Sequence, residues 1–187
     1  MTGTRGYHHG DLRRALLEAA VTAIGDSGPA ALNLRDLARR AGVSHAAPTH
    51  HFGDKAGLLT ALAVEGFDLL AGALHAAGDD HLDVGVAYVT FAVRHRAYFE
   101  VMFRPDVYRA DAPEVRAARS RAGAVLRSGA AALPAGRATA GDARQDALAA
   151  WSIVHGFATL WLAGVLPPDV ETDPEAAARA VIRRLLD

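Results

Sequence analysis

Residues 33–55, NLRDLARRAGVSHAAPTHHFGDK, contain the pattern that decides the fold. Asn33 can cap a first short helix, in which apolar side chains recur at helical spacing. Gly42 can end that helix in the left-handed conformation, and Ser44 can cap a second helix over residues 45–52. Two short helices joined by a three-residue turn that contains glycine are typical of a helix-turn-helix motif.

The rest of the 187-residue chain also favours helices and shows no strand pattern. Alanine, leucine and arginine are abundant, whereas β-branched residues are sparse. Hydrophobic residues make up 51% of the chain and charged residues 22%, which excludes a disordered protein. The sequence therefore predicts an all-α fold. Helices are expected over residues 11–25, 34–41 and 45–52, from residue 54 onward, and over 88–103, 114–132, 142–165 and 173–186.

The absence of cysteine excludes disulfides and thiolate metal sites. The N-terminus has no apolar signal-peptide core. Both features agree with a cytoplasmic location, which is the one we expect.

One apolar segment, residues 147–166, has no Asp, Glu, Lys or Arg and is long enough to span a bilayer. His155 lies in its middle, and Ser152 and Thr159 flank that histidine. A helix that is apolar on all sides can equally be buried in a protein core or an oligomer interface. We favour the buried helix and expect no membrane partner.

Charge is unevenly distributed along the chain. Residues 1–60 hold seven Lys or Arg, five Asp or Glu and five of the nine histidines, whereas the remainder holds 13 basic and 16 acidic residues. A mildly basic, histidine-rich N-terminal part is a weak indication of a surface that faces an anionic partner.

The second helix of the motif can supply DNA contacts. Its first turn offers His45, whose ring can bond a base edge, and small residues that allow close approach to DNA. Lys55, at the start of the next helix, is placed to bind a phosphate. The alternative is a helical hairpin that binds nothing.

The three histidines of this stretch also raise the possibility of a metal site. His45 and His50 are five residues apart, and His50 and His51 point about 100° apart on a helix, so none of these pairs has the favourable i, i+4 spacing. We therefore favour DNA contact or solvent exposure over metal binding, and expect no metal and no cofactor. The sequence also shows no set of nucleophile, base and orienting group, so no catalytic residue is expected.

Residues 33–63 resemble the DNA-binding segment of the TetR family of bacterial transcriptional regulators. That family's pattern is Ala-Gly-Val-Ser, a variable stretch, Tyr-x-His-Phe, two residues and Lys. This sequence keeps AGVS at 41–44, His51-Phe52 and Lys55. The resemblance implies phosphate contacts by Asn33, Arg35, Ser44, Thr49, His51 and Lys55, and base contacts by His45, Ala46, Ala47 and His50.

The sequence departs from the family pattern at two of these positions. Thr49 stands where tyrosine is usual, and Ala46 where glycine is frequent. Threonine is shorter than tyrosine, so it would miss a phosphate that tyrosine reaches or contact it only through water. A member with weakened DNA binding is therefore one alternative.

The second half resembles the C-terminal ligand-sensing domain of one branch of the family, marked by Trp151 and by His155-Gly156. Aromatic and histidine side chains add polar tips to an apolar bundle, as in small-molecule pockets, although each residue alone fits an ordinary core. The expected pocket comprises Phe67, Tyr88, Phe91, His95, Tyr98, Met102, Trp151 and His155.

The resemblance also implies a homodimer, in which the last two long helices pair with their copies. The expected interface comprises Trp151, Phe157, Trp161, Val181 and Leu185. Such a dimer presents two recognition helices to a palindromic DNA operator. Residues 1–56 would form the three-helix DNA-binding domain, and residues 57–187 the helical domain that senses the ligand and dimerises.

The expected function is that of a DNA-binding transcriptional regulator, a repressor released by a small apolar or amphipathic effector. The alternatives are an activator, the weakened DNA binder, and an enzyme that uses His155. The enzyme is the least favoured, because no partner group for His155 is visible in the sequence.

Overall fold

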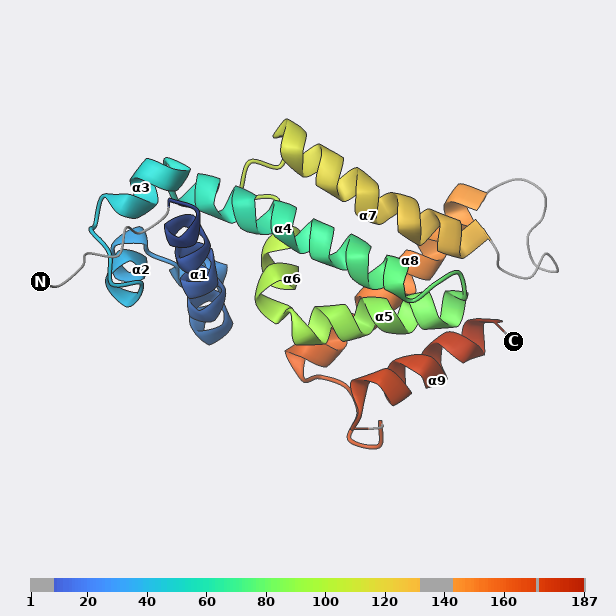
Figure 1. Ribbon diagram of the computed structural model, residues 1–187. Coiled ribbons are helices and arrows are strands. Elements are labelled where there is room, and N and C mark those ends of the chain that lie inside the picture. The colour runs from blue at the N-terminus through green and yellow to red at the C-terminus, as the bar shows by residue number, and fades with distance from the viewer. Residues whose placement is uncertain (1–8, 132–142, 171, 187) are drawn as a thin grey trace, which may run out of the picture. The chain divides into compact units, whose positions relative to one another are not determined.

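The computed structural model describes residues 9–131, 143–170 and 172–186, and the regular structure in these ranges is entirely helical (Figure 1). The prediction of an all-α fold is confirmed. The helices are α1 (His9–Ala31), α2 (Leu34–Arg40), α3 (Ala47–Phe52), α4 (Lys55–Ala76), α5 (His81–Arg94), α6 (Arg96–Met102), α7 (Pro113–Ala131), α8 (Ala143–Ala163) and α9 (Pro174–Leu186).

The chain folds into two compact units. The first contains the described residues up to Val64 together with 97–115, and the second contains 65–96 and the described residues from Arg116 onward. The helix-turn-helix motif therefore shares its unit with the first half of α4, with α6 after Arg96 and with the segment that leads into α7. These units divide the chain differently from the expected domains 1–56 and 57–187.

In the first unit, α1, α2 and α3 form the three-helix arrangement expected of the motif (Figure 1). Helix α2 packs on both α1 and α3. Leu16 and Ile24 of α1, Leu37 of α2 and Phe52 of α3 are buried. Burying this apolar stripe is what stabilises helices as short as α2 and α3, which would not persist alone in water.

Helix α1 continues past the expected end at residue 25. Its axis is interrupted at Gly28, whose φ of 77° and ψ of 164° are not helical. Glycine adopts this conformation without steric cost, and Pro29 then suits the first turn of a new helical segment. The Gly-Pro pair thus bends the helix and leaves a short final turn that ends at Ala31.

In the second unit, α5 packs against both α8 and α9 (Figure 1). Gly85 is what allows the close approach, because a Cβ added there would lie 2.8 Å from Cδ1 of Ile182 on α9. Ion pairs Arg94–Glu175 and Arg179–Asp83 also join α5 to α9. These pairs are largely exposed, so they contribute little to stability compared with the apolar contacts.

The aromatic stripe expected as one helix over 88–103 is two helices, and that expectation was wrong. Helix α5 ends at Arg94, and His95 has φ −117° and ψ 40°, which is not helical. Its backbone N–H still donates to the carbonyl of Phe91 at 2.8 Å, so the end of α5 is capped. Apolar spacing continues across the break because both helices bury one face, which hides the break from a periodicity analysis.

Helix α4 is the described helix that is long and apolar enough to cross a membrane, judged by length and composition only. Half of its apolar window is buried within the protein. Buried core helices of soluble proteins have the same composition. The segment 147–166, which raised this question in the sequence, does not meet the same measure among the described residues.

Candidate nucleic-acid interface

The N-terminus of α2 is capped by Asn33. Its side-chain oxygen accepts a hydrogen bond from the backbone N–H of Arg35 at 2.8 Å. Asp36 lies in the first turn, where its negative charge interacts favourably with the positive end of the helix dipole. Asn33 and Arg35 are both exposed, as a phosphate contact requires.

The turn between α2 and α3 begins at Gly42, as the sequence predicts, but it ends two residues later than expected. Gly42 has φ 67°, and the N–H of Val43 donates to the carbonyl of Ala38 at 3.0 Å, which closes α2. Helix α3 begins at Ala47 and not at residue 45, so Ser44 is not its cap. Pro48 explains the later start, because proline favours the first turn of a helix, where its missing N–H is not needed.

Exposure divides this motif into an inner and an outer face. Ala47, Pro48 and Phe52 of α3 are buried. His51 is half-buried. The outer face includes Ser44, His45, Ala46, Thr49 and His50, which are all exposed. The assignment of Ala47 to the base contacts is therefore corrected: its methyl group packs inside the unit.

Lys55 is held in place before any ligand arrives. Its Nζ donates a hydrogen bond of 2.7 Å to the carbonyl of Ala30, in the short final turn of α1. This turn exists because of the bend at Gly28. An ammonium has three donors, so the bond to Ala30 leaves others available to a phosphate.

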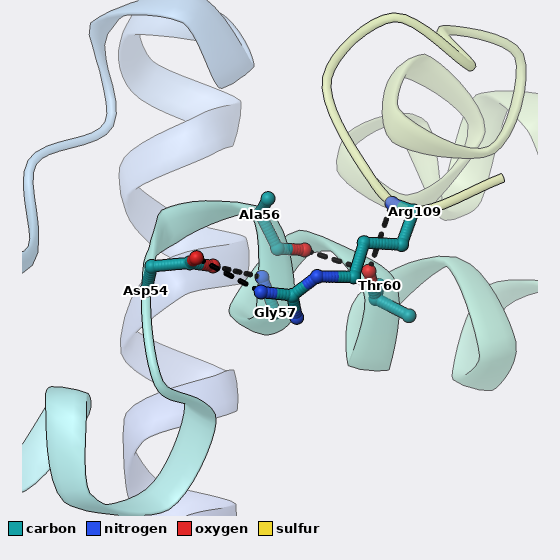
Figure 2. Close-up of polar contacts among 5 residues, drawn as sticks. All are labelled: Asp54, Ala56, Gly57, Thr60 and Arg109. Carbon is teal, nitrogen blue, oxygen red and sulfur yellow. Dashed lines mark hydrogen bonds and ion pairs between the residues drawn. The ribbon is translucent and has the colours of Figure 1, made fainter. Parts of the chain in front are cut away.

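A polar network that the sequence analysis missed joins the start of α4 to Arg109 (Figure 2). Asp54 accepts from the N–H of Gly57 through Oδ1 at 2.8 Å and from the Arg109 guanidinium through Oδ2 at 2.8 Å. The hydroxyl of Thr60 accepts from the backbone N–H of Arg109 at 3.0 Å and donates to the carbonyl of Ala56 at 2.7 Å. All five residues belong to the first unit.

The sequence offered only a faint signal for this network. Thr60 is a single hydroxyl within the apolar run GLLTALA, and its side chain is buried with 5% exposure. Arg109 lies in a segment between two prolines and meets Asp54 from 55 residues away, so no local pattern connects them.

The histidines of the motif do not form a metal-binding cluster in the part of the chain that the structure describes, where no group of three His, Cys, Asp or Glu side chains is placed to hold an ion. The rings of His50 and His51 are 5.5 Å apart in an edge-to-face arrangement. His45 and His50 are both exposed. Their polar edges are therefore available at the surface of the motif.

In the second unit, Tyr88 connects two of the expected pocket residues. The N–H of the Trp151 indole donates to the Tyr88 hydroxyl at 3.1 Å, and that hydroxyl lies 2.9 Å from Nδ1 of His155. When the hydroxyl donates to Nδ1, His155 is neutral with its proton on Nε2. Burial raises the pKa of the Tyr88 phenol and lowers the pKa of His155, and both shifts favour this neutral arrangement.

The other expected pocket residues are divided between the two units. Phe67 and Phe91 are buried in the second unit, whereas Tyr98 and Met102 belong to the first. His95 is exposed and stacks on Phe91 with ring centres 5.1 Å apart. The break between α5 and α6 is the reason for this division, because it separates two halves of what the sequence suggested was one stripe.

The expected interface residues are also divided by exposure. Trp151 is 36% exposed and Val181 39%, and Trp161 is half-buried. The position of Phe157 is a correction, because its side chain is 8% exposed and belongs to the core of the unit. The side chain of Leu185 lies outside the described residues. Exposed apolar side chains near these positions include Leu148 at 55% and Leu160 at 48%, both on α8.

Comparison with known families agrees with both halves of this description. Residues 16–62 match the family described as bacterial regulatory proteins, tetR family. Residues 81–185 match the tetracyclin repressor-like C-terminal domain. The chain belongs to the TetR family. A TetR-family protein is a DNA-binding transcriptional regulator, typically a ligand-responsive repressor, and not an enzyme.

Individual relatives extend the similarity over most of the chain. The HTH-type transcriptional regulator BetI of Rhizobium meliloti (strain 1021) is 40% identical over 106 residues, which are 57% of this chain and 47% of BetI, so the match spans about half of that relative. A protein of unknown function from Rhodococcus sp. RHA1 is 35% identical, with 98% of this chain and 97% of that one covered and a TM-score of 0.78. AibR, solved with isovaleryl coenzyme A and operator DNA, is 18% identical and shares the TetR fold, with a TM-score of 0.67 over 92% of this chain and 97% of AibR.

Proposed function

We propose that this TetR-family regulator contacts DNA through a surface formed by the exposed side chains at the start of α2, the α2–α3 turn and the outer face of α3. The observation that carries the proposal is the division of α3, in which the apolar side chains are buried while Thr49 and His50 are exposed beside His45. His45 and His50 would meet base edges, and Asn33, Arg35, Ser44, Thr49, His51 and Lys55 would meet phosphates. Ala46 would allow close approach.

We also propose that the protein acts as a homodimer in the cytoplasm on a palindromic operator. The support is a set of exposed apolar side chains on α8 and α9, namely Leu148, Trp151, Leu160 and Val181. Large apolar side chains left exposed on a single copy can be covered by a second copy in a dimer. A two-fold axis would use the same surface on both copies and present two α3 helices to the two half-sites.

The effector that we propose is a small apolar or amphipathic molecule bound in the second unit, which releases a repressor from its operator. Phe67, Phe91 and Tyr88 supply apolar area there, and Tyr88 shares its hydroxyl with Trp151 and His155. An apolar site with a few polar groups is typical of ligand recognition. We also propose, from Trp151 and His155-Gly156, that the chain belongs to the branch of the family that carries this motif.

The DNA-contacting surface can be tested by a gel-shift assay with the duplex upstream of the protein's own gene. The variant with Lys55→Ala and His45→Ala together is expected to bind about tenfold or more weakly, because each lost phosphate or base contact costs about 1 kcal/mol. Removing Lys55 should also reduce the slope of log affinity against log salt concentration by about one.

The matched control is the double variant His75→Ala and Arg127→Ala, which removes one exposed histidine and one exposed cation from the second unit. This control should bind as the wild type does. Undiminished binding by the Lys55 and His45 variant would rule out the assigned surface. In a reporter fused to the bound promoter, the protein should lower expression, and raised expression would identify an activator.

A further inference from the structure

Asp54 performs two separate tasks at the junction between α3 and α4. The junction consists of Gly53, which ends α3 with φ 79°, and Asp54 itself. One carboxylate oxygen caps α4 by accepting from the N–H of Gly57, and the other accepts from the guanidinium of Arg109. The residue that links the proposed recognition helix to α4 is therefore also the partner of a side chain from a distant segment.

Arg109 is bonded to the start of α4 and its cap through both its backbone and its guanidinium (Figure 2). Its backbone N–H is fixed to the buried hydroxyl of Thr60, and its guanidinium to Asp54. The hydroxyl of Thr60 is itself fixed by the carbonyl of Ala56. An exposed ion pair between two mobile side chains contributes little, but here the backbone of the arginine is already held, so less freedom is lost when the pair forms.

Gly57 shows how closely the parts of the junction are packed. A Cβ added at Gly57 would overlap the carbonyl oxygen of Phe52, the last residue of α3, and would lie 2.8 Å from the Nη1 atom of Arg109. The end of α3, the first turn of α4 and the guanidinium therefore meet at one point. A change in the position of Arg109 would therefore act directly beside the end of α3.

We propose that Arg109 is a positioning residue for DNA binding: through Asp54 and Gly57 it fixes the junction that orients α3, without contacting DNA itself. This inference rests on the proposed function of the α3 surface. Arg109 acts on Asp54 by charge and geometry together, because a guanidinium presents donors in a rigid planar fork that an ammonium cannot copy.

The test uses the full-length protein and, as probe, the highest-affinity duplex that the wild type selects from a random-sequence pool. Arg109→Ala is expected to reduce affinity about two- to fivefold, which is the fold-change that corresponds to a mostly exposed ion pair of about 0.4–1 kcal/mol. Asp54→Asn is expected to give a loss of the same size, because asparagine still caps Gly57 but no longer attracts the guanidinium. The two changes combined should cost little more than either alone.

The salt dependence separates positioning from direct contact. Arg109→Ala should leave the slope of log affinity against log salt concentration unchanged, whereas loss of a phosphate contact would reduce it by about one. The matched control is Arg104→Ala, since Arg104 lies in the same segment and pairs locally with Asp106. This control should bind as the wild type does.

Each outcome decides one question. A reduced slope for Arg109→Ala, wild-type affinity for both single variants, or additive losses would overturn the positioning role while leaving the proposed function standing. Recovery of no duplex by the wild type would overturn the proposed function and the inference with it. Arg109→Gln, which keeps length and hydrogen-bond donors, serves as a second variant if alanine lowers the helical ellipticity, and it should show the same loss at an unchanged slope.

Discussion

Each unit of the protein contains a polar network centred on one buried hydroxyl, and the two networks differ in charge. In the first unit the hydroxyl of Thr60 leads outward to the ion pair of Arg109 and Asp54, whose side chains are 52% and 59% exposed. In the second unit the hydroxyl of Tyr88, itself 0% exposed, joins the neutral groups of Trp151 and His155. The first network fixes the position of charged groups near a surface, and the second satisfies one buried hydroxyl with an exposed tryptophan and a half-buried histidine.

This difference determines what a mutation should do in each place. Exposed charges are screened by water and contribute little to folding, so their loss should be seen in binding and not in stability. Buried neutral groups that lose a partner carry the cost of desolvation, so their loss should be seen in the free energy of unfolding. The predictions below test this separation.

The largest effect is expected from Gly57→Ala, which adds a methyl group where α3 and α4 are already closely packed. The new Cβ would overlap the backbone carbonyl of Phe52, and a backbone atom cannot move aside as a side-chain end can. The free energy of unfolding should fall by about 3 kcal/mol, measured by urea denaturation, and operator affinity should fall as well.

Gly85→Ala is the comparison in the second unit, where the nearest atom is the terminal Cδ1 of Ile182 at 2.8 Å. That methyl group can rotate away, so a loss of about 1 kcal/mol or less is expected. Equal losses for Gly57→Ala and Gly85→Ala would contradict the distinction between a backbone and a side-chain obstacle.

Tyr88→Phe should have the second-largest effect. It leaves the Trp151 N–H and Nδ1 of His155 without the hydroxyl they share, and the free energy of unfolding should fall by about 2 kcal/mol. Tyr108→Phe in the first unit removes the bond from the hydroxyl to the carbonyl of Met102 at 2.9 Å, and should cost about 1 kcal/mol. A larger loss of unfolding free energy for Tyr108→Phe than for Tyr88→Phe would contradict the greater contribution expected of the Tyr88 hydroxyl.

The smallest effect is a dependence of stability on pH through His155. Burial lowers the pKa of His155 below its ordinary value of 6.5, so the unfolded chain binds a proton more readily than the folded one. The contribution of His155 to stability is therefore complete above 6.5 and is lost as the pH falls from 6.5 through the lowered pKa. Unfolding curves at a series of pH values should show this decline, and His155→Gln should reduce it because the amide oxygen still accepts from Tyr88 but does not titrate. An unchanged decline in the variant would assign it to other groups.

Much of the fold could be predicted from local patterns, and the exceptions have physical reasons. Asn33 and Gly42 act locally, so the start and the end of α2 were predictable from the sequence. The break at His95 was not, because apolar spacing continues through it. The outer face of α3 was predictable except for Ala47, whose burial depends on where the helix starts. Arg109 could not be found at all, since its partner is set by the tertiary fold.

The bend at Gly28 has a consequence for the entropy of DNA binding. Because the chain turns there, the carbonyl of Ala30 is presented to Lys55, whose long side chain is thereby restricted to few rotamers in the free protein. Ordering a free lysine side chain costs up to about 2 kcal/mol. Part of that cost is already met when the protein folds, so a phosphate that binds here would meet an ammonium whose position is set by the last turn of α1.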